Sequence, residues 1–193
     1  MTFAQMLEQT LQFEGGRSNH EQDRGNETQY GITQNTLNAY LAQRKQQSSN
    51  TYTDFPQDVT ALTLEEVTQI YYEVFYIKPR LALLPNVLQP VVFDMAVNHG
   101  PKRAIKILQH VMNASGLVSI EADGVCRSIT AKSAELCYAQ MGILLVNAIC
   151  DERSAFYERI VACDRTQQVF QKGWQRRAEA FKLTGNVPYE AVS

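Results

Sequence analysis

Apolar residues recur at helical spacing through most of this 193-residue chain, and this periodicity restricts the available folds more than any other feature. The first such stretch runs from Phe3 to Phe13, and Gly15-Gly16 supplies a usual helix stop after it. Only the segment from Thr28 to Thr33 alternates in the way that is typical of a short strand. The sequence therefore predicts a mainly α fold with one short β-hairpin near residues 17–33.

The sequence also predicts how one helix after residue 60 begins and how deeply another is buried. Thr63 and Glu66 stand three residues apart before an apolar stripe, which predicts a capping box. A long helix from about residue 130 to residue 151 is apolar on most sides, so it should be the buried centre of the second half. Two further helices are expected around residues 156–161 and 169–181.

Composition and charge exclude several classes of protein. Hydrophobic residues make up 45% of the chain and charged residues 20%, which is typical of a globular protein and excludes wholesale disorder. The net charge of −2 provides no general attraction to nucleic acid or to anionic membranes, so no nucleic-acid partner is expected. Residues 1–77 carry four Lys/Arg and ten Asp/Glu. An acidic surrounding of this kind would help to keep a glutamic acid protonated, although a solvated acidic surface explains it equally well.

The start of the chain lacks the basic segment and unbroken apolar run of a secretory signal, and no run of 18 apolar residues occurs, so no membrane span is expected. Cys126, Cys137, Cys150 and Cys163 match no metal or redox spacing. They are expected to be buried thiols, with disulfides as the alternative in an oxidising compartment. The His20-Glu21-x-Asp23 sequence has no paired metal-ligand spacing, so neither a metal nor any other cofactor is expected.

Glu14 stands at the predicted end of the first helix, directly before the two glycines. Asp23 and Thr28 follow nine and fourteen residues later, in a polar segment rich in turn formers. A carboxyl group at a helix end, with a second carboxyl and a hydroxyl brought back toward it by a turn, can protonate a glycosidic oxygen and handle an attacking water.

The wider motif resembles a known family. Glu14-Gly15-Gly16 followed by residues 23–33 (DRGNETQYGIT) is similar to the EGG and D-x-G-x-x-T-x-x-G-I-T motifs of glycoside hydrolase family 108, the secretion-activator muramidases related in fold to phage lysozymes. Residues 70–76 (IYYEVFY) resemble the tyrosine-rich helix of the family, and residues 93–100 (FDMAVNHG) resemble its FD-x-A-V-N-x-G helix.

Motifs in the second half resemble the family's peptidoglycan-binding region. Residues 104–109 carry A-x-x-x-L-Q, Asp123-Gly124 with Thr130 resembles DG-x-x-G-x-x-T, and residues 170–177 carry F-x-x-G-W-x-x-R. The chain departs from the pattern at Asn26, Tyr76 and Arg127, where the family usually has glycine, tryptophan and glycine. These departures affect sugar positioning and wall specificity more than the chemistry.

The resemblance implies a lysozyme-like catalytic region at residues 1–117 and a helical peptidoglycan-binding region at residues 118–193. It implies an N-acetylmuramidase, a lysozyme-type glycosidase acting on peptidoglycan, with Glu14 as general acid. Asp23 would stabilise the transition state or act as base, or would only cap the turn. Thr28 would hold the attacking water, or be a plain strand residue. The substrate-binding residues would be Tyr30, Tyr76, Asn98 and Trp174, with a structural role open for Asn98.

Two other interpretations stay open at this stage. A wall-binding module or secretion adaptor with weak catalysis would have the same motifs, and so would a peptidoglycan endopeptidase on the same fold. We expect synthesis in the cytoplasm and action in the periplasm or cell wall after non-classical export. If the protein is a phage endolysin, a holin would be its partner. If it is a secretion aid or an antibacterial effector, a secretion system would be its partner, and an effector would also have an immunity protein.

Overall fold

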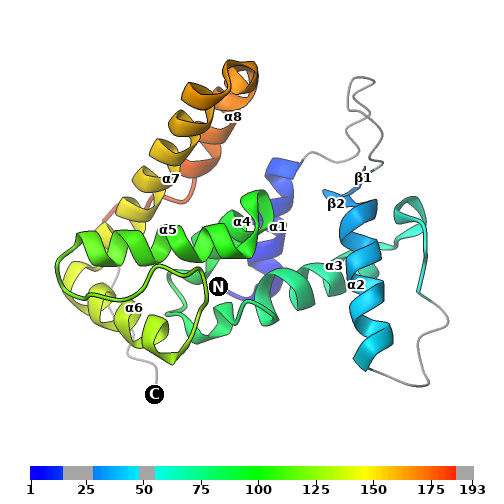
Figure 1. Cartoon of the computed structure of the whole chain (residues 1–193), viewed down its shortest axis with the longest axis horizontal. Coiled ribbons are helices and arrows are strands. Elements are labelled where there is room, and N and C mark those ends of the chain that lie inside the picture. The colour runs from blue at the N-terminus through cyan, green and yellow to red at the C-terminus, as the bar shows by residue number, and fades with distance from the viewer. Residues whose placement is uncertain (15–27, 48–54, 186–193) are drawn as a thin grey trace. The chain divides into compact units, whose positions relative to one another are not determined.

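The computed structural model describes residues 1–14, 28–47 and 55–185. Within these ranges the chain is mainly helical, with one two-stranded sheet (Figure 1). The chain divides into two compact units, residues 2–78 and residues 79–193 together with Met1. We call these the N-terminal and the C-terminal unit. The expected boundary at residue 117 stays a prediction.

The N-terminal unit contains α1 (Phe3–Glu14), the strands β1 (Thr28–Gln29) and β2 (Ile32–Thr33), α2 (Gln34–Gln47) and α3 (Leu64–Ile70). The antiparallel strands pair Thr28 with Thr33 and Gln29 with Ile32, which confirms the predicted hairpin over residues 28–33. Residues 17–27 of the predicted hairpin segment lie outside the described residues. Buried apolar side chains come from every helix of the unit and from β2: Met6, Leu7, Ile32, Leu37, Tyr40, Val67 and Ile70.

The capping box at the start of α3 is confirmed. The Thr63 Oγ1 atom accepts a hydrogen bond from the Glu66 backbone amide, and the Glu66 carboxylate accepts one from the Thr63 amide at 2.7 Å. Helix α3 is followed directly by a π-helix, Tyr71–Ile77, with no break in the helical backbone. Its i+5 pattern includes the Lys78 amide bonded to the Glu73 carbonyl at 2.9 Å. Segments of this kind are rare and often occur at functional sites.

The C-terminal unit contains α4 (Gln89–His99), α5 (Pro101–Ala114), α6 (Ser128–Met141), α7 (Ile143–Cys163) and α8 (Gln168–Glu179). Helices α4 and α5 pack together, and α5 also packs against α6 and α7. Helices α7 and α8 lie side by side as a hairpin (Figure 1). The core is built from buried side chains of these helices, among them Val92, Phe93, Leu108, Met112, Leu145 and Ile149.

The prediction of one helix over residues 130–151 was wrong. Gly142 ends α6 with φ 56° and ψ −135°, and α7 leaves at a bend of 112°. A side chain at this φ would be strained, so glycine permits the break. Helix α7 then runs unbroken to Cys163, and the separate helix expected at residues 156–161 is its second half. The buried thiols are confirmed for Cys126, Cys137 and Cys150, whereas Cys163 is exposed; all four are free.

The Asp123-Gly124 turn is held against α5 by Gln109. The Gln109 Oε1 atom accepts a hydrogen bond from the Gly124 amide at 2.8 Å, and its Nε2 atom donates to Asp123 Oδ1 at 3.1 Å. Gly124 has φ 79°, and a Cβ atom there would lie 2.5 Å from the Lys102 carbonyl oxygen. The A-x-x-x-L-Q and Asp-Gly motifs are therefore hydrogen-bonded to each other, and these bonds hold the loop before α6 against α5.

Candidate functional site

Glu14 is the last residue of α1, where the glycine stop predicted it. The helix forms because Met6, Leu7 and Thr10 recur on one face, and all three are buried. Only the backbone of Glu14 is described, as is the case for Thr28 in β1. Asp23 lies outside the described residues. The catalytic roles of these three residues stay predictions.

Tyr30 lies at the tip of the hairpin, in a two-residue turn with Gly31. Both residues have positive φ, 50° and 79°, as the tight turns that suit twisted strands require. A tyrosine is unfavourable in this conformation, and the turn is fixed by a hydrogen bond of 2.8 Å from the Tyr71 hydroxyl to the Tyr30 carbonyl. The Tyr30 ring itself is exposed. The turn therefore presents this ring to solvent from a fixed backbone.

Tyr76 belongs to an aromatic cluster at the π-helix. Its ring stacks on Tyr72 with centroids 5.7 Å apart, and Phe3 of α1 contacts both rings, at 4.9 Å from Tyr72 and 5.3 Å from Tyr76. Partial burial, with the neighbouring Tyr72, raises the pKa of the Tyr76 hydroxyl, so it stays protonated at neutral pH. Tyr72 is exposed. A half-exposed stack of this kind can support the apolar face of a sugar ring.

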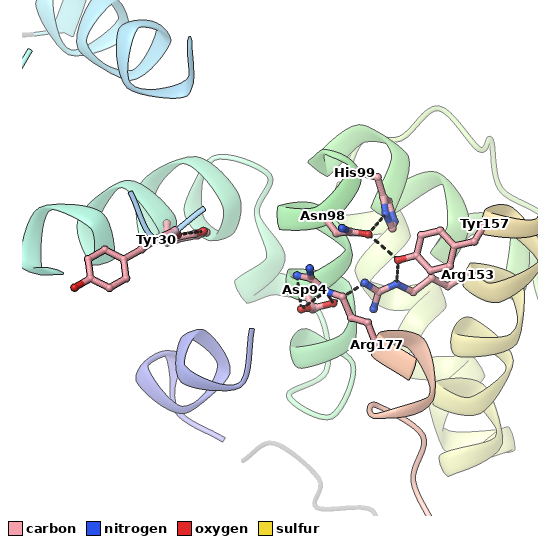
Figure 2. A network of polar contacts seen from close by, with 8 residues as sticks. Tyr30, Asp94, Asn98, His99, Arg153, Tyr157 and Arg177 are labelled. Carbon is pink, nitrogen blue, oxygen red and sulfur yellow. Dashed lines mark hydrogen bonds and ion pairs between the residues drawn. The ribbon is translucent and has the colours of Figure 1, made fainter. Parts of the chain in front are cut away.

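In the C-terminal unit, a buried ion cluster joins α4, α7 and α8 (Figure 2). Asp94 is fully buried and accepts a hydrogen bond from Arg153 Nη2 at 2.6 Å. Arg177 binds the same carboxylate with Nε and Nη2, at 2.9 Å in each case. Two guanidinium groups thus share one carboxylate in a setting with little solvent, where charge-assisted bonds are strong and an unpaired charge is costly.

Asn98 is joined to this cluster through Tyr157. Arg153 Nε donates to the Tyr157 hydroxyl at 2.7 Å, and this hydroxyl donates to Asn98 Oδ1, also at 2.7 Å (Figure 2). His99 Nδ1 lies 3.1 Å from the same oxygen. Because Asn98 Oδ1 is an acceptor, His99 carries its proton on Nδ1, and Nε2 is buried without a hydrogen-bond partner among the described residues. The arrangement fixes Asn98 and His99 at the end of α4.

His99 stays neutral in this setting. Burial lowers the pKa of its imidazole to about 3, helped by the positive charges of Arg153, Arg177 and Arg103. His99 also contacts the rings of Phe156 and Tyr157, at 5.3 and 5.9 Å. It therefore behaves as a packed, uncharged ring and not as a proton donor at neutral pH.

Trp174 stacks on Tyr157 with centroids 5.1 Å apart and an interplanar angle of 24°. Phe170, one turn earlier on α8, also stacks on Trp174, at 5.8 Å and 28°. Arg177 follows Trp174 by three residues on α8, so its ion pair with Asp94 holds the helix that carries the indole.

Sequence reasoning found Asn98 and Trp174 but did not identify Asp94, Arg153, Tyr157 or Phe170 as parts of a site. A charged residue inside the apolar run VVFDMAV was the available signal for Asp94, because a buried charge requires a partner. No local pattern identifies Arg153, which is 59 residues away along the chain.

Comparison with known proteins gives matches over most of the chain. The family model described as Glycosyl hydrolase 108 matches residues 7–100. The model described as Predicted Peptidoglycan domain matches residues 103–179. The resemblance found in the sequence is thus confirmed, and with it the mainly α, lysozyme-like fold.

The solved structure of SagA from Brucella abortus is similar to this chain. The two are 28% identical, with a TM-score of 0.70, over 93% of this chain and 91% of that one. A search of curated proteins gives no match. The two family matches support glycoside hydrolase activity and a role in hydrolysing or binding peptidoglycan.

The described residues contain no group of three His, Cys, Asp or Glu side chains placed to hold a metal ion, and His20 and Asp23 lie outside them. Within the same ranges, no single helix is long and apolar enough to cross a membrane, although the bent pair α6 and α7 has the length and composition for it when the two are taken together.

The Asp94→Asn variant tests the ion cluster. It removes the carboxylate charge that Arg153 and Arg177 share inside the unit, so we expect the free energy of unfolding to fall by about 3–5 kcal/mol. Asp151→Asn is the matched control, because Asp151 pairs with Lys182 at the surface and its loss should cost about 1 kcal/mol or less. Urea unfolding at neutral pH measures both, and equal losses would contradict a dominant role for the cluster.

The His99→Asn variant tests the neutral imidazole. A histidine with a folded pKa of about 3 and an unfolded pKa near 6.5 binds its proton mainly in the unfolded state. Stability is therefore full above pH 6.5 and falls as the pH drops toward 3. Between pH 6.5 and 5, the wild type should lose on the order of 1 kcal/mol more than the variant. The other two histidines are common to both proteins, so identical pH slopes would show that His99 is protonated when folded.

Proposed function

We propose that this protein is an N-acetylmuramidase that cleaves the β-1,4 bond between N-acetylmuramic acid and N-acetylglucosamine, with Glu14 as general acid. The observation that carries the proposal is the family 108 match over residues 7–100, which includes the Glu14-Gly15-Gly16 motif at the end of α1 and the hairpin that follows it. A general acid at this position must hold its proton near neutral pH, which requires an apolar or anionic setting.

The other catalytic and binding roles follow from the same proposal. Asp23 would stabilise the oxocarbenium-like transition state or act as base, and Thr28 would orient the attacking water. In the N-terminal unit, Tyr30 and Tyr76 would contact the sugar. The exposed ring of Tyr30 and the stack of Tyr76 on Tyr72 support these roles. In the C-terminal unit, Trp174 would bind the wall polymer, and Asn98 would be a second residue that binds it.

We place the reaction in the periplasm or cell wall, where the polymer lies. Delivery would use a holin or a secretion system, and an immunity protein would be a partner if the enzyme acts on rival cells.

A wall-binding module or secretion adaptor with weak catalysis is the second candidate. The match of residues 103–179 to a predicted peptidoglycan domain supports it, because a peptidoglycan-binding role needs no cleavage.

The Glu14→Gln variant tests the catalytic assignment. Replacing the acid by an amide removes the proton donor, so clearing of a peptidoglycan suspension should slow by about 10²- to 10⁴-fold. Glu8→Gln is the matched control, since Glu8 is an exposed carboxylate on the same helix and its variant should clear at the wild-type rate.

Equal clearing by Glu14→Gln and the wild type would show that Glu14 is not the acid. If neither protein clears the suspension while both sediment with it, the wall-binding alternative is correct.

A further inference from the structure

Four aromatic rings of α7 and α8 form one continuous series, Phe170, Trp174, Tyr157 and Phe156, which we call the aromatic strip. Its two stacked contacts, Phe170 on Trp174 and Trp174 on Tyr157, have interplanar angles of 28° and 24°. Phe156 follows at 6.0 Å from Tyr157. Phe170 is 54% exposed, Trp174 and Phe156 are half-buried, and Tyr157 is buried. The ring of Tyr157 is therefore inside the unit, and the rings on both sides of it reach the surface.

Hydrogen bonds and an ion pair inside the unit hold the aromatic strip in place. The Tyr157 hydroxyl is bonded on both sides, by Arg153 and to Asn98, and α8 is held by the ion pair of Arg177 with Asp94 (Figure 2). Rings held in this way lose little conformational freedom when a ligand binds. Phe170 is 54% exposed although it stacks on Trp174, so part of its ring is available to a ligand.

A cationic side chain lies against the Phe156 end of the strip. The guanidinium group of Arg103, an exposed residue of α5, lies 5.0 Å from the centre of the Phe156 ring. Such a surface favours a ligand that carries carboxylates.

We propose that the aromatic strip and Arg103 bind the glycan strand of peptidoglycan, with a sugar ring stacked on Phe170 and Trp174 and a stem-peptide carboxylate paired with Arg103. This inference rests on the proposed peptidoglycan function and gives it a binding surface in the C-terminal unit. Peptidoglycan combines the two features that the surface requires: the C–H faces of pyranose rings, which suit the negative face of an aromatic ring, and carboxylates along the peptides. The surface lies within the match of residues 103–179 to a predicted peptidoglycan domain.

Phe170→Ala is the deciding variant. It removes an exposed ring and should leave the fold intact, which a melting curve verifies. All proteins carry Glu14→Gln so that the polymer is not consumed, and affinity is measured by co-sedimentation of the full chain with purified sacculi. We expect affinity to fall about three- to tenfold. Val169→Ala is the matched control, because Val169 is 78% exposed on the same helix and lies outside the strip; its affinity should not change.

Trp174→Ala and Trp174→Phe test the inner ring. The alanine variant should weaken binding at least as much as Phe170→Ala, and the phenylalanine variant, which keeps a ring, should restore most of it. If the alanine variant does not fold, Phe170→Ala and Trp174→Phe carry the test.

Arg103→Glu tests the charge. It should weaken binding to sacculi at low salt but not binding to chitin oligosaccharides, which are uncharged sugar polymers, whereas Phe170→Ala should weaken both. Lys132→Glu, the same charge change at an exposed site on α6, is the control.

The outcomes separate this inference from the proposed function. If Phe170→Ala and Arg103→Glu bind sacculi as tightly as the parent protein, or if the parent does not bind at all, the inference is overturned. In that case wild-type clearing would still support the proposed hydrolase. If the wild type clears nothing but Phe170→Ala weakens binding, the muramidase proposal fails and the binding surface stands.

Discussion

The carboxylate of Asp94 is the constraint on which the C-terminal unit depends. It is fully buried, and it accepts hydrogen bonds from Arg153 on α7 and from Arg177 on α8. Each of the three helices supplies one charged group, so separating any of them would break charge-assisted hydrogen bonds inside the unit. Burial is the main cause of the low pKa of the neighbouring His99, and the charges of Arg153 and Arg177 lower this pKa further.

This cluster joins two segments that the family models treat separately. Asp94 and α4 fall within the glycosyl hydrolase match, whereas Arg153 and Arg177 fall within the peptidoglycan domain match. The end of the hydrolase segment is therefore packed into the same core as the peptidoglycan domain. Asn98, at the end of α4, is bonded to Tyr157, and Tyr157 supports Trp174. A motif residue of one segment thus positions an aromatic residue of the other.

The sequence predicted features that depend on local spacing. The Thr63 and Glu66 capping box, the end of α1 at Glu14 and the hairpin over residues 28–33 are set by neighbours within a few residues, and the structure confirms them. The break at Gly142 was missed because an apolar run looks the same whether one helix or two helices carry it. Only the backbone conformation, with φ 56°, distinguishes the two cases. Trp174 could likewise be named from the sequence because it lies in a motif, and its role in binding stays a prediction. The partners Arg153 and Tyr157 could not be found in this way, since they meet Asp94 and Asn98 only after the helices pack.

Analysis of the fragments released from purified sacculi tests the central claim most directly. Digestion by the wild-type protein should produce new reducing ends on N-acetylmuramic acid, while the stem peptides and their cross-links stay intact. New free amino groups without new reducing sugars would contradict the account, because they would show that the protein cuts peptides and not the glycan strand.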